Sequence, residues 1–144
     1  GPAEGTSNSP ITWTGSDPYD PPILQGSTLN DDYVLHITGD YWIIENVQVA
    51  YAQKGIVLDN SNYSIIRNVE VYSTGTEAIH IRDGSSNCLI QKCYIHNTGL
   101  VTPVYGEGIY IGSSKSTAEY GYNCDNNIIE GCIFKDIAAE PIDI

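Results

Sequence analysis

Residues 42–49, WIIENVQV, decide the fold, because close copies of this segment return along the chain. The copies are SIIRNVEV (64–71), CLIQKCYI (88–95) and NIIEGCIF (127–134), at spacings of 22, 24 and 39 residues. Asn, Gly or Ser residues separate the short strand-like segments, and no stretch between them has the 3.6-residue period of a helix. A repeat of this length and content is typical of a β-solenoid.

A second short strand follows each copy, and the apolar positions recur in phase. These strands are KGIVLDN (54–60), EAIHIRD (77–83), EGIYIGS (107–113) and EPIDI (140–144), and an earlier one, YVLHITG (33–39), precedes them all. One apolar column holds Ile56, Ile79, Ile109 and Ile142, and the next holds Leu58, Ile81, Ile111 and Ile144. A β-sandwich also has short strands separated by turns, but it does not predict such in-phase repetition. The sequence therefore predicts an all-β parallel β-helix of about five rungs.

The predicted helix forms a single domain over residues 3–144. Residues 1–2, Gly-Pro, are interpreted as a protease scar and left out of it. The 144 residues carry 6 Lys+Arg against 18 Asp+Glu, a net charge of −12, so nucleic acid is excluded as a partner. No apolar run is long enough to span a membrane or reads as a signal peptide, so we expect no membrane association and a removed targeting segment.

Charged residues gather on one predicted outer face. Because side chains alternate along a strand, residues between the apolar columns point outward, and equivalent positions in adjacent rungs lie about 4.8 Å apart. The outward columns are Tyr33, Lys54, Glu77, Glu107, Glu140; His36, Val57, His80, Tyr110, Asp143; and Thr38, Asp59, Arg82, Gly112. Core packing does not require charge there, so this face is the candidate functional surface. A ladder of salt bridges between rungs, such as Lys54 with Glu77, is the alternative.

Substrate contacts are predicted on this face and on the loops beside it. Residues 97–106 and 114–126 are insertions relative to the tightest repeat, and such loops commonly wall a binding groove; they can also be ordinary turn excursions. The predicted substrate-binding residues are Lys54, Asp59, Glu77, His80, Tyr110, Tyr120 and Tyr122. β-Elimination from a uronic acid needs a group that neutralises the carboxylate and a base for the C5 proton, for which His80, Arg82 and Tyr110 are candidates.

A calcium site is predicted among Glu107, Glu140 and Asp143. Stacked carboxylates repel one another unless a cation lies between them, and calcium prefers oxygen ligands. The alternative is a solvated acidic face.

The four cysteines lack the Cys-x-x-Cys spacing of a zinc site. Cys93 and Cys132 occupy the same repeat position and should lie side by side, pointing inward. Cys88 and Cys124 are placed to form a disulfide across the second insertion. Disulfides or four free thiols both remain open.

The opening segments SPITWTG, PPILQGS and GDYWIIENVQV resemble secreted pectate-lyase-like right-handed parallel β-helix proteins over nearly the whole chain. GEGIYIGSSKS (106–116) with NNIIEGCIFKDIAAEPIDI (126–144) is similar to the active-site rungs of the chondroitinase and alginate lyase family. The resemblance implies that Glu140 helps to bind calcium and that a catalytic lysine follows Ile144. It also implies that the chain is a fragment of a longer helix.

Three functions follow as hypotheses. The first is a secreted, extracellular β-helix that recognises cell-wall or extracellular polysaccharide without cleaving it. The second is a polysaccharide lyase or hydrolase whose site is completed by residues outside the chain. The third is a structural module that self-associates or docks other proteins through its open ends, where strand edges are unpaired.

Overall fold

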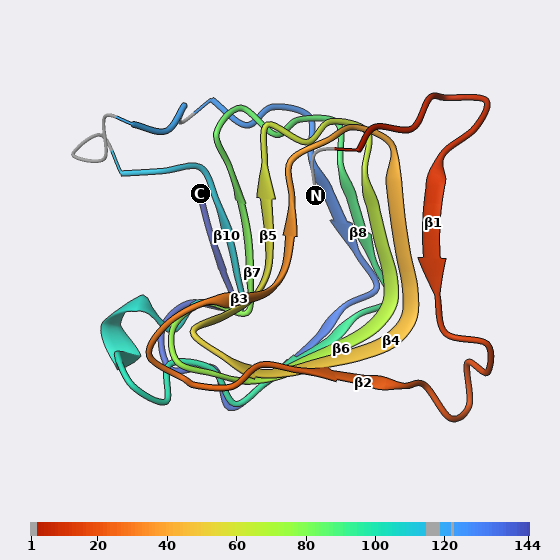
Figure 1. The fold of residues 1–144 in the computed structure, drawn as a ribbon. Helices are drawn as coiled ribbons and strands as arrows, with labels where there is room; N and C mark the ends of the chain where they lie inside the picture. The colour runs from red at the N-terminus through yellow and green to blue at the C-terminus, as the bar shows by residue number, and fades with distance from the viewer. Residues whose placement is uncertain (1–2, 115–118, 122) are drawn as a thin grey trace.

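The computed structural model describes residues 3–114, 119–121 and 123–144 (Figure 1). Short strands wind around one axis in successive turns. The strands are β1 (Ile11–Thr14), β2 (Ile23–Gln25), β3 (Tyr33–Ile37), β4 (Trp42–Ala52), β5 (Lys54–Asp59), β6 (Ile65–Thr74), β7 (Ile79–Arg82), β8 (Leu89–Gln91), β9 (Tyr94–His96), β10 (Ile109–Ile111), β11 (Ile128–Glu130), β12 (Ile133–Lys135) and β13 (Ile142–Asp143). A 3-10 turn, η1 (Pro103–Tyr105), lies before β10. Within the described residues no helix has the length and apolar character to cross a membrane.

The strands form two parallel sheets that confirm the predicted β-helix. One sheet has the order β13-β10-β7-β5-β3, and the other is built around β1-β4-β6-β8-β11, with β2, β9 and β12 attached. Viewed as in Figure 1, β1 runs along one side, β2 along the base, and β3, β5, β7 and β10 along the opposite side. All of the strand pairs are parallel, which contradicts the sandwich alternative. Five rungs are present, as the repeats predicted.

The core is the stack of inward residues, in the predicted register. Ile56 pairs with Ile79, which pairs with Ile109, which pairs with Ile142. The first three of these side chains are fully buried. Full burial of an isoleucine stabilises a fold by about 1.5–3 kcal/mol, so this one column contributes substantially.

One corner of each of four successive turns has a residue in the left-handed backbone conformation, at equivalent positions. Asn46, Asn68, Lys92 and Gly131 follow register-matched strand residues and have φ between 50° and 64°. Asn and Gly tolerate this conformation better than other residues, which explains why they mark the repeat. The side chains of Asn46 and Asn68 are hydrogen-bonded to each other at 2.7 Å.

The four cysteines are free, so the Cys88–Cys124 disulfide is not formed. Cys93 and Cys132 lie side by side as predicted, because β9 and β12 pair in register immediately after them. A hydrogen bond between the two thiols, together with burial, raises the pKa of Cys93, and the same bond lowers the pKa of Cys132 to about 6.

Candidate functional site

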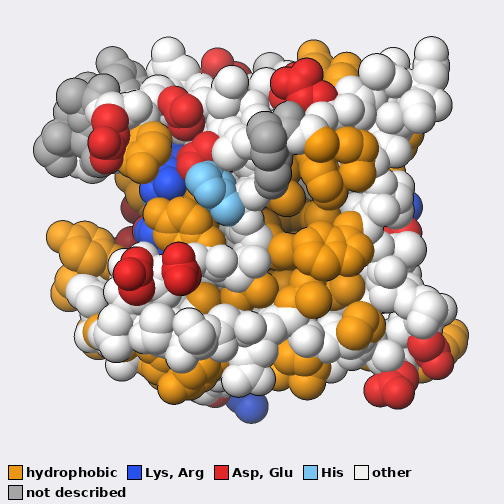
Figure 2. Space-filling model, in the orientation of Figure 1, with side chains coloured by type: hydrophobic (Ala, Val, Ile, Leu, Met, Phe, Trp, Pro, Cys, Tyr) orange, Lys and Arg blue, Asp and Glu red, His pale blue; other side chains and the backbone are white. Residues whose placement is uncertain are grey.

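A cavity of about 450 Å³ lies on the outer face of the five-stranded sheet. Acidic, basic and histidine side chains gather on this side of the molecule (Figure 2). The residues that line the cavity are Lys54, Glu77, His80, Arg82, Val104, Tyr105, Glu107, Tyr110, Ser113, Ser114, Tyr120 and Asp143. Eight of them were named from the sequence: seven belong to the predicted outward columns, and Tyr120 belongs to the second insertion.

The floor of the cavity is one register column. His80 pairs with Tyr110 and Tyr110 with Asp143, and Val57, which pairs with His80, continues the column without lining the cavity. The sequence correctly predicted that these side chains point away from the core. Pointing away from the core does not make them exposed to solvent. Val57 is fully buried and His80 is 5% exposed. The charged groups on this face are therefore partly desolvated, which strengthens their mutual interactions.

Lys54 and Glu77 form a buried ion pair at the cavity wall. Lys54 Nζ donates to Glu77 Oε2 at 2.5 Å, and the two side chains are 12% and 7% exposed. Burial alone would raise the pKa of Glu77, but the charge and hydrogen bond of Lys54 outweigh it, and the pKa is lowered. This ion pair is the salt bridge between rungs that the sequence analysis gave as the alternative role of these two residues.

Arg82 is held by Asp59, one rung earlier. Its Nε and Nη2 donate to the two carboxylate oxygens of Asp59 at 2.6 and 2.9 Å. His36 Nε2 contacts the same carboxylate at 2.7 Å. Burial would raise the pKa of Asp59, but these hydrogen bonds lower it. The guanidinium also lies 4.0 Å from the ring centre of Tyr120, a cation-π contact that fixes one wall of the cavity.

His80 is neutral and its two ring nitrogens are engaged. Nε2–H donates to the carbonyl oxygen of Gly112 at 2.9 Å. Nδ1 lies 3.5 Å from both Lys54 Nζ and Glu77 Oε1. Burial, followed by the positive charge of Lys54, lowers the pKa of His80 to about 4. Its ring stacks on Tyr110 with centres 4.5 Å apart. Both ring nitrogens of His80 are thus occupied within the cavity floor, which disfavours its predicted role as a base.

Glu107 and Tyr110 have polar atoms that remain open to a ligand, and the buried Oγ of Ser113 is likewise without a hydrogen-bond partner among the described residues. Glu107 is 7% exposed, and its buried Oε2 has no hydrogen-bond partner among the described residues. Burial and the nearby carboxylates of Glu77, Asp143 and Glu140 raise its pKa. Burial, then Asp143 and Glu107, also raises the pKa of Tyr110, so the phenol is protonated at neutral pH.

Two predicted site residues do not line the cavity, and a third is not among the residues that the structure describes. Asp59 does not line the cavity but holds Arg82 beside it. Glu140 is exposed and does not line the cavity, whereas Glu107 and Asp143 do. Tyr122 lies outside the described residues. In the described part of the chain, no three His, Cys, Asp or Glu side chains are grouped closely enough to hold a metal ion, so the calcium site stays a prediction.

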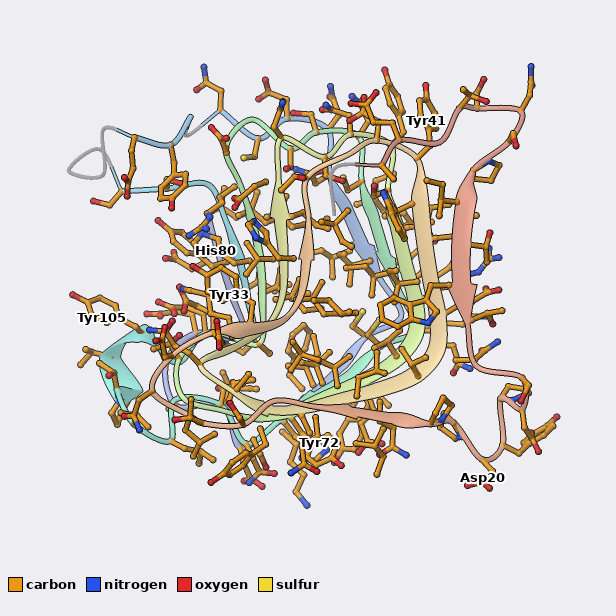
Figure 3. All side chains as sticks on the ribbon, in the orientation of Figure 1. Asp20, Tyr33, Tyr41, Tyr72, His80 and Tyr105 are labelled. Atoms are coloured by element: carbon orange, nitrogen blue, oxygen red, sulfur yellow. The ribbon has the colours of Figure 1, made fainter. Side chains whose placement is uncertain are left out.

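Tyr120 was predicted from the second insertion and lines the cavity, but four other residues outside the strands were not predicted individually. Val104 and Tyr105 come from the first insertion, and Ser113 and Ser114 follow β10. In Figure 3, Tyr105 lies on the same side of the molecule as His80 and Tyr33. The length of the insertion at 97–106 was the available signal, but it does not say which side chains turn toward the cavity.

Comparisons with known proteins agree with this architecture. The family described as "Right handed beta helix region" matches residues 33–144. The chain belongs to the right-handed β-helix family. The comparison with curated proteins found no match. Among solved structures, this β-helix is similar to the alginate lyase from Paenibacillus sp. str. FPU-7, with 41% sequence identity and a TM-score of 0.97.

That similarity covers 99% of this β-helix and 49% of the alginate lyase. The chain therefore spans about half the length of the solved structure that it matches. At this identity the relationship to an alginate lyase concerns sequence as well as fold. It confirms the predicted kinship of this β-helix with polysaccharide lyases.

Proposed function

We propose that the cavity face of this β-helix binds an acidic, uronate-containing polysaccharide. The single observation that carries the proposal is the cavity itself, where Lys54, Arg82 and Tyr110 lie on a parallel sheet and two further tyrosines, Tyr105 and Tyr120, come from the loops beside it. Cations can pair with uronate carboxylates, and tyrosines combine an apolar ring with a hydrogen-bonding hydroxyl. The 41% identity to an alginate lyase supports this substrate class over neutral glycans.

Calcium is the proposed partner of the polysaccharide. Carboxylates balance the two cations, because Lys54 faces Glu77 and Arg82 faces Asp59. An anionic chain approaching Glu107 and Asp143 is repelled unless a cation bridges them, and the unpartnered Oε2 of Glu107 is an oxygen ligand of the kind that calcium takes. Such polysaccharides lie outside cells, so we also propose an extracellular protein.

Calorimetric titration with alginate oligosaccharides tests the proposal, with calcium or with a chelator present. Cello-oligosaccharides serve as the neutral comparison. We expect alginate binding that calcium strengthens, and we expect Tyr110→Ala to weaken it about fivefold, since a stacked or hydrogen-bonded aromatic residue contributes about 1 kcal/mol. Glu107→Gln should remove the calcium effect.

Tyr72→Ala is the matched control, because Tyr72 is a half-buried tyrosine on the other sheet, pointing away from the cavity (Figure 3). Binding that survives Tyr110→Ala but is lost in Tyr72→Ala would move the site to another face. Absence of binding to both polymers, with and without calcium, would refute the proposed function.

A second candidate function, cleavage by β-elimination, is favoured by Tyr110. Its hydroxyl has no hydrogen-bond partner among the described residues and is protonated at neutral pH, so it can donate a proton to the leaving oxygen. The C5 proton would pass to a base supplied by residues outside the chain, as in the second of the predicted functions. Ultraviolet absorbance of an unsaturated product, present with the wild type and lost in Tyr110→Phe, would support cleavage. Binding without such a product would favour recognition alone.

A further inference from the structure

The loop between β9 and β10 exposes a cluster of large apolar side chains. Leu100, Val101, Val104 and Tyr105 are 52%, 45%, 73% and 61% exposed. Apolar residues grouped in this way commonly mark a binding surface. In Figure 1 the loop, which contains η1, projects at the edge of the molecule on the side of β7 and β10.

This loop is held rigidly although its side chains are exposed. The backbone N–H of Leu100 donates to the carbonyl of Thr74 at 3.0 Å, and those of Val101 and Thr102 both donate to Gly75, at 3.1 and 3.0 Å. Residues 100–102 are thus anchored to the preceding rung, and the backbone N–H of Tyr105 donates in turn to the carbonyl of Thr102 at 3.0 Å, which orders the turn that carries the apolar side chains. A preorganised surface loses less entropy when a ligand binds.

Two glycines close the base of the loop. Gly99 has φ +67°, and a Cβ atom there would lie 2.9 Å from the Cα of Gly106. A Cβ atom on Gly106 would lie 2.6 Å from the Cα of Gly99. The two ends of the loop therefore approach as closely as glycine allows. Thr98 Oγ1 also donates a hydrogen bond to the carbonyl of Gly106 at 2.5 Å.

Only one half of the apolar cluster turns to the cavity. Val104 and Tyr105 line it, whereas Leu100 and Val101 do not. The exposed Tyr105 ring thus continues the cavity wall outward from the polar floor at His80 and Tyr110. An apolar wall over a polar floor matches a pyranose ring, which has apolar C–H faces and a rim of hydroxyl and carboxylate groups.

We propose that Tyr105, backed by Val104, is a stacking platform for one sugar ring of the polysaccharide at the mouth of the cavity. This inference rests on the proposed function and adds a specific subsite to it. The C–H face of a uronate ring lies on the tyrosine ring, and its polar rim points to the cavity floor. Tyr105 is a binding residue in this scheme and takes no part in proton transfer.

The test compares alginate oligosaccharide binding by Tyr105→Ala, Tyr105→Phe and Leu100→Ala. We expect Tyr105→Ala to weaken binding about tenfold, because a stacking contact is lost. Tyr105→Phe retains the ring and should bind within about twofold of the wild type. Leu100→Ala removes an equally exposed apolar side chain of the same loop outside the cavity and should bind normally.

The outcomes separate this inference from the proposed function. Wild-type affinity in Tyr105→Ala together with weakened binding in Tyr110→Ala would overturn the platform while the cavity remains the polysaccharide site. No binding by any form would overturn both. Sedimentation adds a further check: concentration-dependent association that is lost in both Tyr105→Ala and Leu100→Ala would identify the loop as a contact between copies of the chain, and so overturn the platform.

Discussion

The side chains on the cavity floor show how their surroundings set the chemistry of each residue. His80 has the residue type of a general base, yet its Nε2–H is bonded to Gly112 and its Nδ1 faces Lys54. It holds the turn after β10 and packs on Tyr110. Arg82 has the residue type that pairs with substrate carboxylates, yet both of its bonds to Asp59 are already formed. The hydroxyl of Tyr110 remains available.

The neutral state of His80 makes stability depend on pH. Its pKa is about 4 in the folded chain and 6.5 when unperturbed, so between these values the unfolded chain binds a proton that the folded chain does not. The free energy of unfolding should therefore fall as the pH is lowered from about 7 to about 4, by about 3 kcal/mol. Urea denaturation at several pH values measures the decline.

His80→Gln is the comparison for this decline. Asp59 and Glu77 have lowered pKa values and act in the same direction, but at lower pH than the His80 step begins. The difference between wild type and variant isolates the histidine. Parallel stability curves for the two proteins would show that His80 does not titrate as described.

At the scale of elements, the corners fix the register of the strands. In the larger sheet, β4 bends at Asn46 and β6 at Asn68, and the same corner recurs at Lys92 between β8 and β9 and at Gly131 between β11 and β12. A left-handed conformation costs an L-residue about 1–2 kcal/mol, and β-branched residues tolerate it worst. Asn reduces this cost through local hydrogen bonding, and the Asn46–Asn68 contact joins two rungs.

Asn68→Val is expected to lower the free energy of unfolding by about 2 kcal/mol, because it adds a β-branched side chain in a left-handed corner and removes an exposed hydrogen bond. Asn68→Gly loses the same bond but keeps the backbone conformation accessible, so it should cost less. Thermal unfolding of both variants measures the effect. Equal melting temperatures for the two would show that the corner is not under conformational constraint.

At the scale of the whole molecule, stability is distributed along the axis of the helix. Each rung contacts only its neighbours, as in other solenoids. β5 and β7 have paired strands on both sides, whereas β1 and β13 each pair with one strand among the described residues. The middle of the chain is therefore held more firmly than its ends.

Hydrogen exchange should reveal this gradient. We expect the backbone amides of β5 and β7 to exchange slowest and those of β13 and β1 fastest, because local opening starts where a rung has one neighbour. Mass spectrometry of peptic fragments resolves these segments. Equal protection along the chain would show that the helix opens only as one cooperative unit.

The repeat predicted the parallel sheets, the core columns and the floor of the cavity, since each depends on residues that recur in phase. Ile56, Ile79 and Ile109 are buried in the expected register, and His80 and Tyr110 are adjacent as expected. The repeat did not predict that Tyr105 lines the cavity, because a loop without a repeat has no register. Nor did it predict that His80 is engaged, because that depends on the carbonyl of Gly112 beyond the next strand.

The stacked corners give this protein a unit of length. Residues 46 and 68 are equivalent points one turn apart, so the chain between them advances the structure by one translation along the axis without altering the path of either neighbour. A tandem copy of that 22-residue turn would meet matching backbone partners above and below. The molecule can therefore be lengthened by whole turns of the solenoid, while the groups around the cavity keep their mutual spacing.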